Sequence, residues 1–408
     1  MKRKVLAAII IAMGILAGCG GDGGNPSQSL PTLDDDSVST ESSDETDQSS
    51  EETPPESEEF VGDMKKGGET HTIGERTEVN GQKQSYLTGE WKPTEVVDRR
   101  NMAVMIDNIK IALPQYGISQ ASIIYEAPVE GRITRLMALF EDYDDLDHIG
   151  PVRSSRDYYI YEAMAYDSIY CNWGLARPWV EELINSDKID NISCPLAGIN
   201  DGAANSFDRL VRSGNIPLEH TGYMFINGYN KDVDSKGYSK TYRSSFVQAF
   251  TFAEDGYLAT YDSYPDATQV YPGGPSGQTN EGGYGKHNPC FTYNPEDRLY
   301  YRTQYRENHI DEMNGEQLAV TNVVFKVCHG EERLPDDPSY DYLKFDHTGS
   351  GNAYVFTNGK VIKGTWRRSG DNEPNLFFDE SGNEIVLNQG KTWICCIWDS
   401  FENCISYE

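Results

Sequence analysis

Residues 20–60 restrict the fold most strongly, because they cannot contribute to a hydrophobic core. This stretch holds thirteen Asp or Glu residues, no Lys or Arg, and few large apolar side chains. Such a composition buries too little apolar surface to offset the entropy that is lost when a chain becomes ordered. We therefore predict a disordered acidic tether, and we expect the folded body to form from the residues that follow it.

The first nineteen residues have the pattern of a targeting segment. Basic residues 2–4 precede an apolar run over residues 5–17, which is shorter than the ~20 residues that span a bilayer. The run leads into "LAGC", where small residues precede Cys19. This pattern resembles a bacterial lipoprotein signal, which implies cleavage before Cys19 and lipid on that cysteine. An ordinary secretory signal or an uncleaved anchor is the alternative.

The body is anionic. Residues 61–408 carry 32 basic and 52 acidic side chains, so their formal net charge is −20. Nucleic-acid binding depends on basic side chains that neutralise phosphates, so this balance argues against a nucleic-acid partner.

The N-terminal part of the body alternates between strand and helix patterns. Apolar runs predict strands over 102–107, 121–127, 132–141 and 168–174. Helical spacing of apolar residues predicts helices over 156–167 and 177–186. This order favours a layered α/β domain.

Short strands and turns dominate the remainder. "AYVFTNGKVIKGTW" places Asn358-Gly359 between two alternating runs, a strong hairpin signal, and residues 375–398 hold three more short strands. We therefore predict an α+β protein with an N-terminal α/β layered domain and a β-rich C-terminal domain. The predicted segments are a signal peptide at 1–18, a lipidated and disordered acidic tether at 19–85, the N-terminal domain at 86–245 and the C-terminal domain at 246–408.

The stretch "GPVRSSR" forms the centre of a candidate ligand site. Arg153 and Arg156 flank Ser154 and Ser155, either of which could cap the predicted helix. A helix N-terminus and two guanidinium groups together suit a carboxylate or a phosphate. An internal ion-pair network with the domain's own carboxylates and a solvated surface are the alternatives.

Other polar residues lie at the predicted strand ends. They are candidates because charged groups at strand ends commonly line a site in an α/β layer. The tryptophan could stack on a sugar ring, although core packing is its usual role. These further candidates are Asp107, Asn108, Glu126, Glu130, Arg132, Arg135 and Trp173.

Familiar catalytic patterns are missing from the sequence. It contains no G-x-S-x-G, no H-E-x-x-H, no P-loop and no dinucleotide fingerprint. The eight cysteines show no C-x-x-C spacing, and Cys395 and Cys396 would point to opposite faces of a strand. We therefore expect no cofactor and no metal site, and no disulfide pairing can be assigned.

Several ordered motifs resemble the YerB-like lipoproteins. They are "RNMAVMIDN", "ASIIYEAPVEGRITRLMALF", "HIGPVRSSRDYYI", "AYDSIYCNWG", "GSGNAYVFTNGKVIKGTW" and "GNEIVLNQGKTWI". The resemblance implies an extracytoplasmic lipoprotein of Gram-positive bacteria with a two-domain body of undefined activity. Relatives carry an "APHNLY"-like segment where this chain reads "LEHTGYM", with His220 as the candidate for that histidine's place.

Three functional hypotheses follow. The first is a lipid-anchored binding or scaffolding protein on the outer face of the cytoplasmic membrane, which recognises an anionic cell-wall component or an envelope protein. The second is a hydrolase of envelope glycan or peptide that uses Glu126, Glu130 or Asp107 as acid or base. The third is an interaction module that uses an edge strand of the C-terminal sheet.

Overall fold

The computed structural model describes residues 76–408 except 177–178, 195–204, 213, 276–281 and 334–341. All of these belong to one compact unit, Gly62–Glu408. The predicted signal peptide, Cys19 and most of the predicted tether lie outside the described residues. The last residues of the predicted tether form strand β1 (Gln82–Gln84), which pairs with β2 (Trp91–Pro93), so regular structure begins before residue 86.

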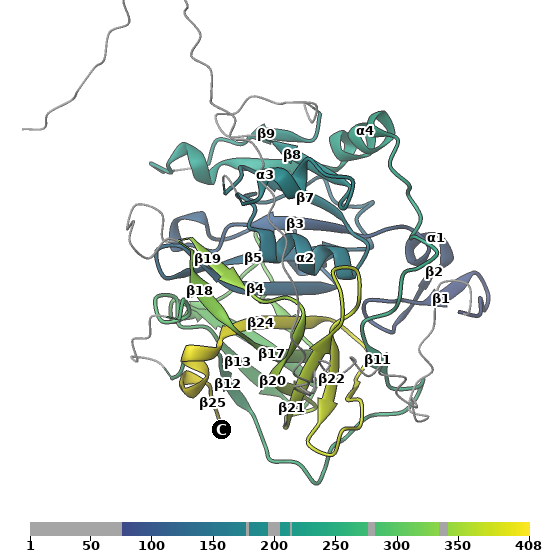
Figure 1. Ribbon diagram of the computed structural model, residues 1–408, viewed down its shortest axis with the longest axis vertical. Coiled ribbons are helices and arrows are strands. Elements are labelled where there is room, and N and C mark those ends of the chain that lie inside the picture. Colours follow the sequence, from purple (N-terminus) through teal and green to yellow (C-terminus); the bar gives the residue numbers. More distant parts are fainter. Residues whose placement is uncertain (1–75, 177–178, 195–204, 213, 276–281, 334–341) are drawn as a thin grey trace, which may run out of the picture. The chain divides into compact units, whose positions relative to one another are not determined.

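A mixed sheet of ten strands organises the described residues (Figure 1). Five of its strands come from residues before 245 and five from residues after it. In spatial order they are β22 (Leu376–Asp379), β21 (Lys360–Arg368), β20 (Gly349–Thr357), β17 (Asn322–Cys328), β24 (Thr392–Trp398), β4 (Ile123–Val129), β5 (Ile133–Phe140), β3 (Met102–Ile106), β7 (Ile169–Trp173) and β8 (Asn191–Cys194).

The parallel pairing of β4 with β24 joins the two parts of the chain. Its register runs from Ile123 opposite Thr392 to Glu126 opposite Cys395. Strands β3, β7 and β8 run in the same direction as β4, whereas β5 runs against both β3 and β4. The carboxyl ends of these parallel strands therefore lie at one edge, where α/β sheets commonly place ligands.

Alternation along the strands separates two hydrophobic cores, one on each face of the sheet. On β4, Tyr125 and Ala127 belong to one core and Ile124 to the other. Helices α2 (Asp157–Ala165) and α3 (Glu181–Ile184) contribute to the first core, and α4 (Ile226–Lys236) contributes to the second. We call these two sides the α2 face and the α4 face.

A second sheet contributes to the core on the α4 face. It consists of β15 (Glu307–Asn308), β14 (Leu299–Gln304), β13 (Cys290–Asn294), β12 (Gln269–Tyr271) and β25 (Ser406–Tyr407), with β16 (Ala319–Val320) also paired to β14. Buried Phe291, Tyr300 and Val320 from these strands pack in that core together with Trp393 of β24.

The remaining elements are short. The small sheets comprise β6 (His148–Ile149), β9 (Phe207–Arg209), β10 (Gly222–Phe225), β11 (Thr251–Phe252), β23 (Val386–Leu387), β18 (Gly330–Glu332) and β19 (Leu343–Phe345). The other helical turns are α1 (Thr94–Val97), η1 (Lys110–Ala112), η2 (Ile118–Gln120), η4 (Leu218–His220) and η5 (Asp399–Cys404).

Most of the predicted elements are present near their expected bounds. The four predicted strands of the N-terminal part correspond to β3, β4, β5 and β7, and the first predicted helix corresponds to α2. Asn358 and Gly359 form the turn between β20 and β21, both with positive φ, as an Asn-Gly hairpin requires. The helix predicted over 177–186 is described only as the single turn α3. The described chain is rich in strands, whereas the layered α/β arrangement of the N-terminal domain and the boundary at 245/246 stay predictions.

Candidate functional site

Five of the sequence-predicted residues gather at the edge where the parallel strands end. Asp107 follows β3, Glu130 follows β4, and Arg135 lies near the start of β5. Arg153 and Arg156 belong to the segment between β6 and α2. We call these five residues the arginine cluster.

Carboxylates hold two of the three arginines. Arg156 donates through Nε to Glu130 Oε1 at 2.6 Å, and its Nη2 contacts the second oxygen of the same carboxylate. Arg153 Nε lies 3.4 Å from Asp107 Oδ2, and Arg153 Nη1 donates to the carbonyl oxygen of Glu219 at 2.6 Å. The predicted internal pairing therefore exists, but it does not involve every arginine.

Arg135 has a different environment. Its Nη1 donates to the carbonyl oxygen of Ser154 at 2.8 Å, and no carboxylate of the described residues lies within 4.0 Å of its guanidinium group. Burial, followed by the positive charges of Arg156 and Arg153, lowers the pKa of Arg135 to about 10. The arginine cluster thus contains three guanidinium groups but only two carboxylates. A bound anion would relieve the repulsion among the three guanidinium groups.

His220 joins the arginine cluster from η4. Its Nδ1 lies 2.6 Å from Asp107 Oδ2, and both side chains are buried. Burial alone would raise the pKa of Asp107. The hydrogen bond with His220 and the charges of Arg153 and Arg135 outweigh burial and leave that pKa lowered. Only the family resemblance drew attention to His220, because its partner lies more than one hundred residues away in sequence.

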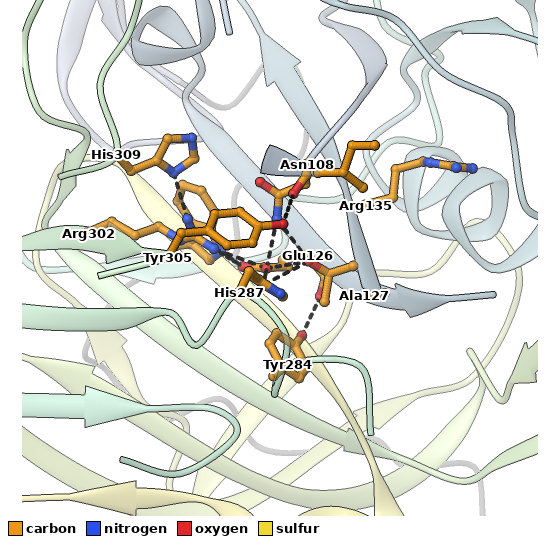
Figure 2. Close-up of polar contacts among 12 residues, drawn as sticks. Asn108, Glu126, Ala127, Arg135, Tyr284, His287, Arg302, Tyr305 and His309 are labelled. Carbon is orange, nitrogen blue, oxygen red and sulfur yellow. Dashed lines mark hydrogen bonds and ion pairs between the residues drawn. The ribbon is translucent and has the colours of Figure 1, made fainter. Parts of the chain in front are cut away.

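Glu126 and Asn108 do not reach the arginine cluster, which corrects the expected grouping. Successive strand residues point to opposite faces, so Glu126 and Thr134 lie on the α4 face, whereas Arg135 does not. Asn108 Nδ2 donates to Thr134 Oγ1 at 2.9 Å and to Glu126 Oε1 at 3.2 Å. Figure 2 shows Arg135 pointing away from these residues.

Glu126 instead forms the centre of a buried polar network with residues from the C-terminal part (Figure 2). Arg302 Nη2 lies 3.0 and 2.9 Å from its two oxygens, and His287 Nε2 lies 2.8 Å from Oε1. Trp393 Nε1 donates to Oε2 at 3.0 Å. Burial would raise the pKa of Glu126, but the charge of Arg302 and the hydrogen bond with His287 lower it to about 2. A general acid needs the opposite shift, so Glu126 is unsuited to that role.

The α2 face carries a similar buried cluster. Glu162 of α2 lies 2.6 Å from Lys326 Nζ and 3.2 Å from Arg368 Nη1, and it accepts a hydrogen bond from Asn375 at 2.7 Å. Burial would raise the pKa of Glu162, but the charges of Lys326 and Arg368 lower it to about 2. Both faces of the sheet therefore place an N-terminal carboxylate against C-terminal cations.

The expected serine cap is absent. Helix α2 begins at Asp157 with Arg156 as its N-cap residue, and no side chain caps it. Ser155 Oγ instead lies 2.8 Å from the hydroxyl of Tyr170, and Ser154 contributes its carbonyl oxygen to Arg135. The serine side chains therefore do not cap the helix.

The two remaining candidates lie apart from the ion pairs of the arginine cluster. Arg132 is exposed in the turn between β4 and β5, with a positive φ of 57°. Trp173 packs against Phe207, and Arg209 lies 4.5 Å above its ring. Packing thus accounts for Trp173.

The described part of the chain holds dispersed metal-binding side chains and free thiols. No group of three or more His, Cys, Asp or Glu residues there could hold a metal ion. The seven cysteines from Cys171 to Cys404 are free thiols, and six of them are buried. Cys395 and Cys396 belong to opposite cores, as their neighbouring positions predict. None of the described helices is both long and apolar enough to cross a membrane.

Comparisons with known proteins show that the chain matches both domains of one protein family. Residues 87–239 match the family model "Protein of unknown function (DUF3048) N-terminal domain". Residues 281–394 match the corresponding C-terminal domain, and together the two matches cover more than half of the chain. The chain belongs to the YerB-like family.

A sequence and a crystal structure, both of YerB from Bacillus subtilis, support this assignment. "Putative lipoprotein YerB" of strain 168 is 26% identical over 318 residues, which cover 77% of this chain and 86% of the relative. A crystal structure of the YerB protein matches with a TM-score of 0.64 and 23% identity, covering 80% of this chain and 99% of that chain. This second likeness shows a shared fold.

Proposed function

We propose that this protein is a lipid-anchored lipoprotein on the outer face of the cytoplasmic membrane, and that its arginine cluster binds an anionic component of the cell envelope. The ligand is a wall polymer or glycan that carries phosphate or carboxylate groups, or an acidic surface of an envelope protein. The observation that carries this proposal is the charge imbalance of the cluster, in which Arg135 has no described carboxylate within 4.0 Å.

Two observations support the proposed lipid anchor: the "LAGC" motif, and a relative that is named a putative lipoprotein. In this proposal residues 1–18 are a signal peptide, Cys19 carries the lipid, and the acidic stretch acts as a disordered linker. An N-terminal α/β layer and a β-rich C-terminal part then form the body. The negative charge of the tether would hold the body away from an anionic lipid surface.

The decisive experiment separates ligand binding from stability. Arg135→Met removes the charge and keeps most of the side-chain length. Because the guanidinium group has no described carboxylate partner, we expect the free energy of unfolding to change by less than about 1.5 kcal/mol, the worth of one hydrogen bond. Affinity for phosphate-linked wall glycans, for muropeptides or for both should fall at least about tenfold, as measured by calorimetry.

The comparison needs two further variants. Arg156→Ala breaks an ion pair in which Arg156 is buried and Glu130 is partly buried, and it should cost up to about 3–5 kcal/mol of stability, so it reports on structure. Arg306→Met removes an exposed arginine of the C-terminal part and should change neither the free energy of unfolding nor the affinity for these anions. If wild-type protein binds none of these anions, or if Arg135→Met binds them as wild type does, the proposed ligand site is wrong.

A further inference from the structure

A hollow lies away from the arginine cluster, at the seam between the N-terminal and C-terminal parts. Its volume is about 520 Å³, within the range of small-molecule sites. One wall comes from residues 118–124, which include η2 and the start of β4. The other walls come from β14, from residues 314–320 and from the start of β24.

The floor of this seam cavity is apolar and its rim is polar. Ile124, Leu318, Val320 and Trp393 line it and are buried. Amides and hydroxyls stand around the opening, from residues such as Gln120, Tyr301, Asn314 and Gln317. An apolar floor with a few polar groups at the mouth is the usual form of a site for a small organic ligand.

Lys391 supplies a cation to the wall of the seam cavity. Its ammonium group donates to the carbonyl oxygen of Ser119, and no carboxylate of the described residues lies within 4.0 Å of it. Burial and the charge of Lys92 lower the pKa of Lys391, whereas Glu90, Asp311 and Glu316 act against that shift. An ammonium group has three donors, so Lys391 can serve a further acceptor.

Hydrogen bonds hold the walls in place. The carboxylate of Asp311 accepts from the backbone nitrogens of Gly117 at 2.9 Å and Ser119 at 2.7 Å, across nearly two hundred residues of sequence. It also accepts from Met313 N at 2.8 Å. On the floor, Trp393 is fixed by its bond to Glu126. A cavity that is formed before the ligand arrives loses less conformational entropy on binding.

We infer that the seam cavity binds a small organic carboxylate with an apolar substituent, whose carboxylate pairs with Lys391 while the apolar group packs over Trp393 and Val320. The end of a peptide with an apolar last residue and a medium-chain fatty acid share this chemistry. Glu316 on the rim disfavours ligands with several negative charges, so one carboxylate is the expected number.

The test uses ligands that differ only in the carboxylate. N-acetyl-leucine and N-acetyl-phenylalanine represent a peptide end, octanoate represents a fatty acid, and the corresponding amides lack the charge. We expect at least one of the acids to bind the full-length protein, and its amide to bind about tenfold or more weakly, as measured by ligand-observed NMR titration. The acid that binds shows whether the natural ligand is the end of a peptide or a fatty acid.

Three variants test whether the acid binds in the seam cavity. Lys391→Met should abolish the preference for acid over amide, and Ala319→Phe should block both ligands by filling the hollow. Lys188→Met removes a lysine outside the cavity and should leave binding unchanged. Urea unfolding of each variant checks that it folds. The inference is overturned if no acid binds, if acid and amide bind equally, or if folded Lys391→Met retains the preference.

Discussion

Glu126 and Arg302 form an ion pair in which neither side chain is more than 1% exposed. Glu126 lies on β4 and Arg302 on β14, so the pair joins residues that are 176 positions apart in sequence. His287, Thr134 and Trp393 contact the same carboxylate. Two charges taken out of water are tolerated here because both oxygens of the carboxylate and both terminal nitrogens of the guanidinium group have partners, whereas the buried Arg302 Nε has no hydrogen-bond partner among the described residues.

Removal of one partner should therefore be costly. Arg302→Met leaves the carboxylate of Glu126 buried without its cation, and we expect the free energy of unfolding to fall by about 3–5 kcal/mol in urea titrations. The matched control is Lys360→Met, which breaks a pair with Asp266, a residue whose side chain is 78% exposed. That variant should lose less than about 1 kcal/mol. Equal losses in the two variants would contradict the assigned role of the buried pair.

Stability should decline steeply in acid. The pKa of Glu126 and that of Glu162 are each lowered to about 2 in the folded protein, from an ordinary value of 4.5. The unfolded chain binds these protons first, so their stabilisation is present above pH 4.5 and is lost as the pH falls towards 2. Each group contributes on the order of 3 kcal/mol to this loss.

The free energy of unfolding at intervals between pH 6 and pH 3 measures this slope. Glu162→Gln should have a shallower slope than wild type over that range, although it is less stable at neutral pH. Glu312→Gln alters an exposed carboxylate and serves as the control. Parallel curves for Glu162→Gln and wild type would show that the Glu162 pKa is not lowered.

His309 should remain neutral and adopt one tautomer. Burial, followed by the charge of Arg302, places its pKa well below 6.5. Arg302 Nη1 lies 2.6 Å from His309 Nδ1, and Arg302 can only donate, so Nδ1 is the acceptor. His309 Nε2–H then donates to Gln115 Oε1 at 2.6 Å. The nitrogen chemical shifts of the ring should show protonated Nε2 and no titration between pH 7 and pH 5. A midpoint near 6.5 would contradict this.

Cys19 should determine where the protein is found. Cells fed labelled palmitate should incorporate label into wild type, and Cys19→Ala should lose the label and leave the detergent-extracted membrane fraction. Cys404→Ala, which removes a thiol near the other end of the chain, is the matched control and should behave as wild type. Equal labelling of wild type and Cys19→Ala would refute lipid attachment at this position.

Local patterns in the sequence predicted the strands and the hairpin well. The alternating runs on either side of Asn358-Gly359 and the apolar run that forms β3 carry their own signal, because neighbouring residues determine them. The spatial order of the strands in the sheet could not be predicted from such patterns. Strand β24 follows β22 and β23 closely in sequence, yet it lies between β17 and β4. Pairing between distant strands leaves no local pattern.

The candidate site shows the same limit. Arg153, Arg156, Asp107 and Glu130 lie close to strand or helix ends, so the sequence indicated that they would gather at one edge. Glu126 was grouped with them by proximity in sequence, although its position on β4 directs it to the other face. Arg302, His287 and Lys391 could not be predicted as partners, because their contacts depend on how the C-terminal strands pack.

The central pairing of β4 with β24 also limits the order in which the chain can fold. Ile123 pairs with Leu139 of β5 on one side, but its partner on the other side, Thr392, lies 269 residues later in the sequence. Until that segment is available, the β24 side of β4 presents unpaired backbone groups, which invite pairing with other chains. We therefore expect the ten-stranded sheet to be completed only when β24 joins it, and a chain cut short before residue 392 would lack the strand that connects its two parts.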